Sequence, residues 1–310
     1  MYARHFPSVE INSSNYAIPT ENTVEKWVTC VGSGEFRFTF KAFGLFTNKS
    51  VDPKALPGTV KDRMSDAQRA CATVTWDALK GNGALDVAWQ AYNDALLVAY
   101  RASTSKVPHV VAMFQFPLSF GPSQTNLRHV LECRRRLDYR IAMAVEFRDR
   151  NWFVGDAKND MQLLKRLRDR GIGIVHADEL HHETFPNAKN AQGDEKLVRK
   201  VLPICMDVTS NEFAYVRIHR RTGFEDRRLS AAEIGRWRDR IRDIAAKLDD
   251  GATIFVFWGT EHANEPLINK ENLRCALKEL QSVEVVEPKK VVDKGLRRFF
   301  PFMGITSSNT

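Results

Sequence analysis

The chain lacks the long apolar runs and the leader that a membrane-inserted or secreted protein needs. Its uncharged hydrophobic stretches fall far short of the about 20 residues that cross a bilayer, and the opening MYARHFPSVE has no apolar leader segment. Cysteine is scarce, with five scattered residues and no CxxC pair, which excludes a disulfide scaffold and a zinc ribbon. We therefore expect an intracellular protein, cytoplasmic or nuclear, that does not bind membranes.

The motifs of common cofactor sites and covalent mechanisms are also missing. The sequence has no GxxxxGKS or GxxxxGKT, no GxGxxG, no HExxH and no GxSxG. We therefore expect no cofactor. One run, HADELHHE, gathers possible ligands of a divalent metal, namely His176, Asp178, His181 and His182. A metal there is the weaker hypothesis, because the spacing matches no metal motif and neighbouring loop histidines are usually only solvated.

The composition favours one large globular unit. Hydrophobic residues make up 43% of 310, which is enough for a sizeable core. Lysine and arginine number 46 against 38 acidic residues, so the net charge is +8. This excess permits a phosphate-bearing small molecule or nucleic acid as partner, but it does not require one.

Strand-like and helix-like segments alternate along most of the chain, which predicts a parallel sheet of about seven strands. The expected strands are 9–12, 36–41, 110–116, 141–148, 172–177, 215–219 and 254–258. Helices are expected at 23–28, 85–99, 127–137, 161–170, 230–248 and 272–280. We predict one domain over 1–280, with an insertion at 48–84 and a long surface loop at 184–212, followed by a basic tail at 281–310.

Polar residues share one parity at the ends of several predicted strands. In a parallel barrel one parity packs against the helices and the other fills the lumen, so these polar side chains should converge at the C-terminal mouth. They are Glu10, Asn12, Lys41, Gln115, Glu146, Arg148, Asp178, Arg217 and His219. A ligand site is favoured over a self-neutralising ion network, because burying so many charges for stability alone is rarely advantageous.

Chemistry assigns provisional roles within this group. Glu10, Glu146 and His219 are the candidates for acid–base catalysis, since a mouth of mixed charge separates carboxylate pKa values. The remaining residues are the candidates for substrate binding, with Lys41, Arg148 and Arg217 suited to an anion. The aromatics that follow Gln115 and Arg148 could stack on a base or sugar, or simply pack in the loops.

Several motifs together resemble the YecE-like family, catalogued as domain of unknown function 72. They are VEINSSNY (9–16), FRFTFKA (36–42), FQFPLSF (114–120), AVEFRDRNWF (144–153), HAD (176–178) and YVRIHRR (215–221). The resemblance spans roughly residues 2–280. It implies a TIM-barrel-like α/β fold, distantly similar to the barrel of endonuclease IV, but no established activity.

The sequence departs from the family pattern in three places. Family members normally begin with a strand resembling IGTSGW, which is missing before Tyr2, so we expect an incomplete barrel. The segment SVEVVE at 282–287 is a candidate for the vacant strand position. Arg220 stands where the family usually has glycine. The paired asparagines that the family often has after the last strand are also missing. Gly259, Thr260, His262 and Asn269 would have to take their place, with Asn269 as a substrate-binding candidate.

The tail adds a possible partner. Leu296 lies three residues before Phe299 and Phe300, with basic residues on both sides, which resembles the peptide that binds the sliding clamp. Asp293 stands where that peptide usually has glutamine. The leading hypothesis is a phosphate-directed enzyme or binder acting on nucleic acid or a nucleotide, in DNA maintenance. The alternatives are a carbohydrate or small-metabolite hydrolase or isomerase, and a non-catalytic adaptor recruited through the tail.

Overall fold

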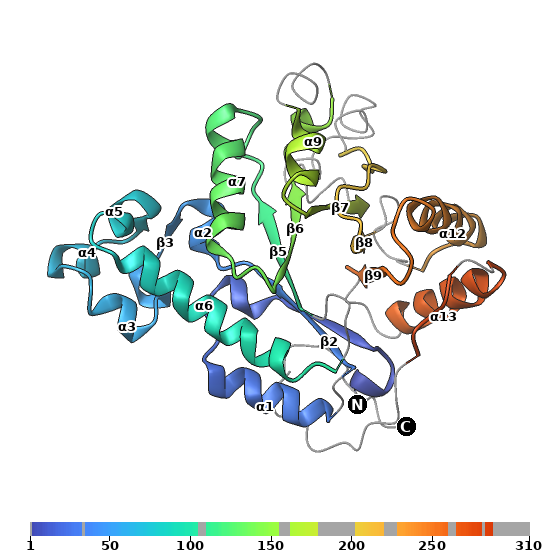
Figure 1. Cartoon of the computed structure of the whole chain (residues 1–310), viewed down its shortest axis with the longest axis horizontal. Coiled ribbons are helices and arrows are strands. Elements are labelled where there is room, and N and C mark those ends of the chain that lie inside the picture. The colour runs from blue at the N-terminus through green and yellow to red at the C-terminus, as the bar shows by residue number, and fades with distance from the viewer. Residues whose placement is uncertain are drawn as a thin grey trace.

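The main sheet has seven parallel strands that curl almost into a closed barrel, as a computed structural model of the chain shows (Figure 1). The structure describes residues 2–32, 35–104, 110–154, 162–178, 202–219, 228–259, 265–280 and 283–287. The strand order is β1-β2-β5-β6-β7-β8-β9. The strands are β1 (Ser8–Ile11), β2 (Arg37–Lys41), β5 (Val110–Phe116), β6 (Ala142–Phe147), β7 (Ile172–Asp178), β8 (Phe213–Ile218) and β9 (Thr253–Trp258). This confirms the expected TIM-barrel-like fold.

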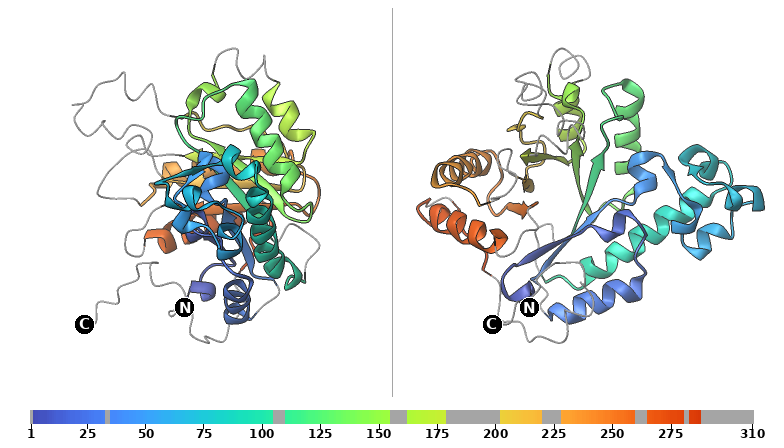
Figure 2. Two further views of the ribbon diagram at one scale, coloured as in Figure 1. Left: turned by 90° about the vertical axis from the view of Figure 1, so that its left-hand side faces the viewer. Right: turned by 180° about the vertical axis from the view of Figure 1, so that it is seen from behind.

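Helices cover the outside of the sheet (Figure 2). The longer ones are α1 (Glu21–Val31), α6 (Ala84–Arg101), α7 (Gln124–Arg136), α9 (Leu163–Arg168), α12 (Ala231–Ala245) and α13 (Glu265–Lys278). A capping box begins α12, where Ser230 Oγ accepts from the Glu233 amide at 3.3 Å and the Glu233 carboxylate accepts from the Ser230 amide at 2.8 Å. Short 3₁₀ turns lie at Tyr2–Arg4, Ser13–Asn15, Pro53–Ala55 and Arg150–Trp152. Of the helices that the structure describes, none could cross a membrane.

Two segments expected to be weakly structured are built into the fold. The 48–84 insertion forms a two-stranded antiparallel sheet and short helices, and it buries Val60 and Leu79 completely. The helix α2 (Gly44–Asn48) leads into it, and its elements are β3 (Ser50–Val51), α3 (Gly58–Lys61), α4 (Asp66–Ala70), β4 (Val74–Thr75) and α5 (Trp76–Lys80). Residues 202–212, predicted as part of a surface loop, have no helix or strand, yet Thr209 is buried and bonds the backbone of Ile172 and Ile174. The Thr209 hydroxyl supplies the hydrogen bonds that the β7 backbone needs where β8 does not reach it.

The barrel has an outer core and a lumen core, which follow the predicted parity. Val9, Val145 and Phe147 pack outward against the helices. The lumen is filled lower down by a separate apolar cluster that includes Val111, Met113, Ala144, Val175, Phe213, Tyr215 and Phe255. Apolar side chains therefore occupy the lower lumen, and the charged residues lie at the strand ends above them.

Gly173 on β7 makes room for the aromatic ring of Phe213 in the lower lumen. A Cβ at this position would lie 2.7 Å from Cζ of Phe213 on the next strand. We predict that Gly173→Ala lowers stability by about 1–3 kcal/mol, because overpacking a closed core forces strain. Chemical denaturation would measure the loss. The double variant Gly173→Ala/Phe213→Leu should recover most of it, and an unaltered single variant would contradict this account.

The sheet is left open between β1 and β9, which are the two ends of the strand order. Val283–Glu287, part of the candidate closing strand, lies at this opening beside the first residues of β1 and β9. In the described chain it forms no ladder with either strand. The tail residues Leu296, Phe299 and Phe300 lie outside the described residues, as do Arg220, Thr260 and His262.

Candidate functional site at the barrel mouth

Glu146, at the end of β6, is the centre of a buried polar network. Its side chain is 2% exposed. One carboxylate oxygen accepts from Gln115 Nε2 at 2.7 Å and from Arg148 Nε at 2.8 Å, and the other accepts from Arg217 Nη1 at 2.7 Å. Three neighbouring segments, β5, β6 and β8, are therefore joined through one carboxylate.

Arg217 extends the network across the lumen to β1. Its Nη2 donates to Glu10 at 3.1 Å, while the other Glu10 oxygen accepts from the hydroxyl of Tyr215 at 2.7 Å. That hydroxyl also lies 2.9 Å from Thr39 Oγ1. Burial, and then the charge of Glu10, raises the pKa of Tyr215 well above its usual value, so the phenol stays protonated.

Tyr215 and Thr39 were missed by the sequence argument. Their signal was present, because Tyr215 precedes Arg217 by two residues and Thr39 precedes Lys41 by two. The same parity that placed the charged residues in the lumen also places these two side chains there, one layer deeper.

The electrostatics make Glu146 a permanent anion. Burial alone would raise its pKa, but Arg217, Arg148 and His219 together lower that pKa well below the usual carboxyl range. The pKa of Arg217 is correspondingly raised, since Glu10 and Glu146 outweigh its burial. A carboxylate whose two oxygens are both engaged in this way is a poor general base, and its hydrogen bonds hold Arg148 and Arg217 in position.

A cavity of about 320 Å³ opens beside this network, at the ends of β2 and β5. It is lined by Asn15, Lys41, Thr47, Asn48, Gln115, Pro117, Leu118 and Arg148. Burial, and then the nearby Arg217, lowers the pKa of Lys41. Within the described part of the chain, the Lys41 ammonium has no hydrogen bond or ion pair. The cavity therefore contains a partly buried cation with no direct anionic partner.

The loop after β1 contributes a different asparagine from the one expected. Asn12 is exposed and begins the 3₁₀ turn at Ser13–Asn15 without a side-chain cap. The turn brings Asn15 into the cavity lining, where its Nδ2 donates to the Ala42 carbonyl at 2.8 Å. Strand alternation ends at Ile11, so extending the parity one residue past the strand gave the wrong asparagine.

His219 follows β8 and packs against the end of β9. It is buried, and its backbone amide donates to the Asp178 carbonyl at 2.7 Å. A Cβ at Gly259 would overlap the imidazole ring, so this position must be glycine if the ring keeps its place. The electrostatic effect of His219 on Glu146 places it at the mouth with the rest of the network.

Three other candidates lie elsewhere. Asp178 shares the parity of Ile174 and His176, which face away from the lumen, and not that of the lumen residue Val175. The Nδ1 atom of His176 lies 2.6 Å from the Cys205 carbonyl, and the ring is 1% exposed. Asn269, on α13, is fully buried and accepts from the amide of Leu229 at 2.9 Å, which fixes the approach to α12.

The metal hypothesis gains no support from the described ranges, where no three histidine, cysteine or acidic side chains are grouped as ligands. The backbone bond of His176 occupies one of its ring nitrogens and turns the ring away from the mouth. His181 and His182 lie outside the described residues.

The aromatic residues after β5 and β6 belong to the core. Trp152 is completely buried, stacks on Phe147 with ring centroids 4.3 Å apart, and donates its indole N–H to the Phe120 carbonyl. Phe116 and Phe120 stack on each other with centroids 4.2 Å apart. They are therefore unavailable to stack on a ligand, and loop packing was the correct alternative.

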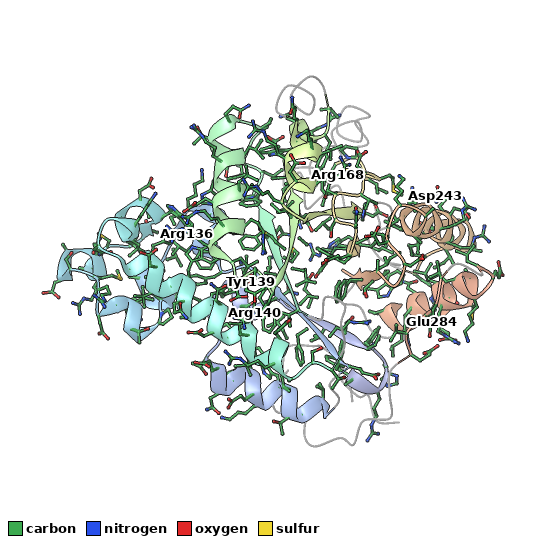
Figure 3. All side chains as sticks on the ribbon, in the orientation of Figure 1. Arg136, Tyr139, Arg140, Arg168, Asp243 and Glu284 are labelled. Carbon is green, nitrogen blue, oxygen red and sulfur yellow. The ribbon has the colours of Figure 1, made fainter. Side chains whose placement is uncertain are left out.

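The basic strip at 128–140 is partly neutralised by its own neighbours. Arg136 pairs with Asp86 at 2.6 Å and with Glu132 at 2.7 Å, while Arg140 pairs with Asp138 at 2.8 Å. Figure 3 shows Arg136, Tyr139 and Arg140 close together between α6 and α7. The mouth cavity, where Lys41 has no such partner, is the stronger candidate for an anion site.

The fold and the charged mouth define a parallel α/β-barrel protein with a polar pocket at the carboxyl ends of its strands. The family described as "Protein of unknown function DUF72" matches residues 1–291, and the chain belongs to this family. UPF0759 protein YunF of Bacillus subtilis (strain 168) is 28% identical over 152 residues, which are 49% of this chain and 43% of YunF. The match thus spans less than half of that curated relative.

Solved structures of the same family have the same fold. A DUF72 family protein of Enterococcus faecalis V583 is similar with a TM-score of 0.65 at 17% identity, covering 89% of this chain and 92% of the other. A DUF72 family protein of Thermotoga maritima MSB8 gives a TM-score of 0.56 at 18% identity, covering 88% and 85%. At this level of identity the similarity supports the barrel and assigns no activity.

The network makes a prediction about stability. We expect Glu146→Gln to lower the free energy of unfolding by about 3–5 kcal/mol near neutral pH, because it leaves Arg217 and Arg148 short of a buried counter-charge. Since the folded pKa of Glu146 is depressed, its contribution is complete above the ordinary carboxyl pKa of 4.5 and is lost as the pH falls below that value. Denaturant unfolding between about pH 7 and pH 3 measures both effects.

The control is Asp169→Asn, which removes an exposed carboxylate that pairs with Lys165 at 2.9 Å. It should cost no more than about 1 kcal/mol, because exposed ion pairs are screened by water. Equal losses in the two variants would show that the Glu146 network contributes no more than a surface pair.

Proposed function

We propose that the mouth cavity binds the phosphate of a nucleotide-sized ligand, through Lys41 and Arg148. The observation that carries this proposal is the Lys41 ammonium, which lines a cavity with no ion-pair partner among the described residues. A partly buried ammonium without a counter-charge is costly unless an anion completes it.

The surrounding charges support an anion in preference to a neutral ligand. Among the described residues, the mouth brings together three cations, Lys41, Arg148 and Arg217, and two carboxylates, Glu10 and Glu146. Arg148 lines the cavity while its Nε is held by Glu146, so its guanidinium is oriented before any ligand arrives. A preoriented arginine beside a lysine suits a phosphate better than a sugar hydroxyl.

The same cavity has an apolar side. Pro117 and Leu118 line it, and Leu118 is 42% exposed. A volume of about 320 Å³ is at the small end of ligand pockets. These features favour an amphipathic phosphate such as a nucleotide, free or at the end of a strand, over the body of a duplex.

The test is phosphate binding with charge-matched variants. We expect inorganic phosphate and a nucleoside monophosphate to raise the melting temperature and to give a measurable Kd by calorimetry. Lys41→Met and Arg148→Gln should each weaken binding at least about tenfold, the loss expected for one charged contact of about 1.4–3 kcal/mol. Arg135→Gln removes the same charge from the exposed face of α7 and should leave the Kd unchanged.

Other outcomes would redirect the assignment. Stabilisation by neutral sugars without any effect of phosphate would favour the carbohydrate or small-metabolite alternative. Binding that weakens equally in all three variants would reflect only the net charge of the protein. The adaptor and sliding-clamp hypothesis depends on the tail and stays a prediction, as does a role in DNA maintenance.

The depressed pKa of Lys41 gives the binding a pH dependence. Burial favours its neutral form, so Lys41 loses its proton at a lower pH than an ordinary lysine. Because a bound phosphate requires the ammonium, we expect affinity to fall on the alkaline side before ordinary lysines titrate. Calorimetry from about pH 7 to pH 10 measures this limb. Lys41→Arg keeps its charge throughout this range and should abolish the loss of affinity at alkaline pH. The same loss in that variant would contradict the role of Lys41 in binding phosphate.

A further inference from the structure

Among the described residues, neither a strand nor a helix fills the opening between β1 and β9. A cavity of about 550 Å³ lies there, larger than the one at the mouth. Its lining includes Ser8 from β1, Arg37 from β2 and Phe255 from β9, together with apolar residues of α12 and α13. The facing edges of β1 and β9 pair with no other strand in the described chain, although every other neighbour in the main sheet is paired. Unpaired strand edges are a source of instability and aggregation.

One segment of the chain already lies in this opening. Val283, Glu284, Val285 and Val286 line the cavity. Their exposure alternates, with Val283 and Val285 partly buried and Glu284 and Val286 exposed. Val285 also packs against the apolar cluster beneath α12 and α13. A period of two in a valine-rich segment is the pattern of a β-strand with one covered face.

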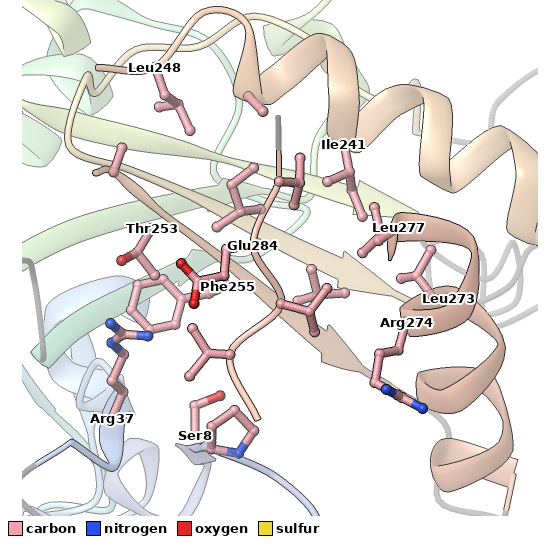
Figure 4. A pocket seen from close by; sticks show the side chains of 18 of the residues that line it. Ser8, Arg37, Ile241, Leu248, Thr253, Phe255, Leu273, Arg274, Leu277 and Glu284 are labelled. Atoms are coloured by element: carbon pink, nitrogen blue, oxygen red, sulfur yellow. The ribbon is translucent and has the colours of Figure 1, made fainter. Parts of the chain in front are cut away.

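The chain topology gives this segment the position of a barrel strand. β9 is followed by α13, and α13 is followed by Val283–Glu287, so the three elements have the order of a strand, a crossover helix and a second parallel strand. Glu287 pairs at 3.0 Å with Arg274, about one turn before the end of α13, which shows that the chain has turned back along the helix. Figure 4 shows the segment that carries Glu284 passing Phe255 toward Ser8.

We infer that Val283–Glu287 is the closing strand of this barrel. It docks between β9 and β1 and pairs with both, so that the sheet becomes an eight-stranded closed ring. Docking gives hydrogen-bond partners to the free backbone N–H and C=O groups on the facing edges of β1 and β9. It also covers the cavity with Val283 and Val285. In the described structure the segment makes the side-chain contacts but forms no backbone ladder with β1 or β9.

The closing strand would act on the mouth through β1. In the described sheet, β1 is paired only with β2, and it carries Glu10, whose carboxylate meets Tyr215 and Arg217 across the lumen. A second partner on the free edge of β1 restricts its movement relative to β8. Docking therefore fixes the distance between Glu10 and Arg217 whatever ligand the mouth binds.

Adjacent valines provide the first test. Val285→Asp places a charge on the covered face, whereas Val286→Asp places the same charge on the exposed face. We expect Val285→Asp to lower the melting temperature by several degrees and to increase amide hydrogen exchange of β1 and β9 at least tenfold. Val286→Asp should leave both unchanged. Equal effects of the two substitutions, or none from either, would overturn the inference.

A backbone test separates a strand from a packed coil. Glu284 is exposed, so Glu284→Ala should be neutral in either case. Glu284→Pro removes an amide donor and should lower the melting temperature and the exchange protection of β1 and β9 only if the segment pairs with them. If Glu284→Pro matches Glu284→Ala, or if amides 283–287 of the unaltered protein exchange as fast as an unstructured peptide, the segment is not a strand.

Discussion

The buried carboxylate of Glu146 is the constraint on which the mouth of the barrel depends. An ionised carboxylate that is 2% exposed must be fully paired, and the chain supplies its partners from three different segments. Gln115, Arg148 and Arg217 therefore have little freedom of position. Arg217 passes the constraint on to Glu10, so β1 is tied to the same centre.

This network separates two explanations that are hard to distinguish in a sequence. Charged residues at a barrel mouth can neutralise one another, or they can await a ligand. Here both occur in adjacent places. Glu10, Glu146 and Arg217 satisfy one another inside the lumen, whereas Lys41 lies at its edge with no ion pair in the described chain. The part formed by Glu10, Glu146 and Arg217 holds the mouth in place, and Lys41 lies beside it.

The sequence predicted the barrel and most of its mouth because both depend on a period of two. Alternation along β6 and β8 was enough to place Glu146 and Arg217 together, although they are 71 residues apart. The same rule failed at Asn12, where the strand ends and a turn begins, and it does not place Asp178 with the lumen residues, since Asp178 has the opposite parity to Val175. Asn15, Thr47 and Asn48 enter the cavity through loops and short helices, whose directions no periodic pattern specifies.

The roles of the carboxylates could not be predicted in the same way. Glu10 and Glu146 look equivalent in the sequence, as acidic residues near the ends of two strands. They differ because Glu146 accepts from two arginines and an amide, while Glu10 shares one arginine with it and meets a phenol. Such differences arise from the shear of the barrel, which decides which strand ends are level with each other. It follows that Glu146 behaves as part of the scaffold and that Glu10, on the strand at the open edge, is the carboxylate whose surroundings can change.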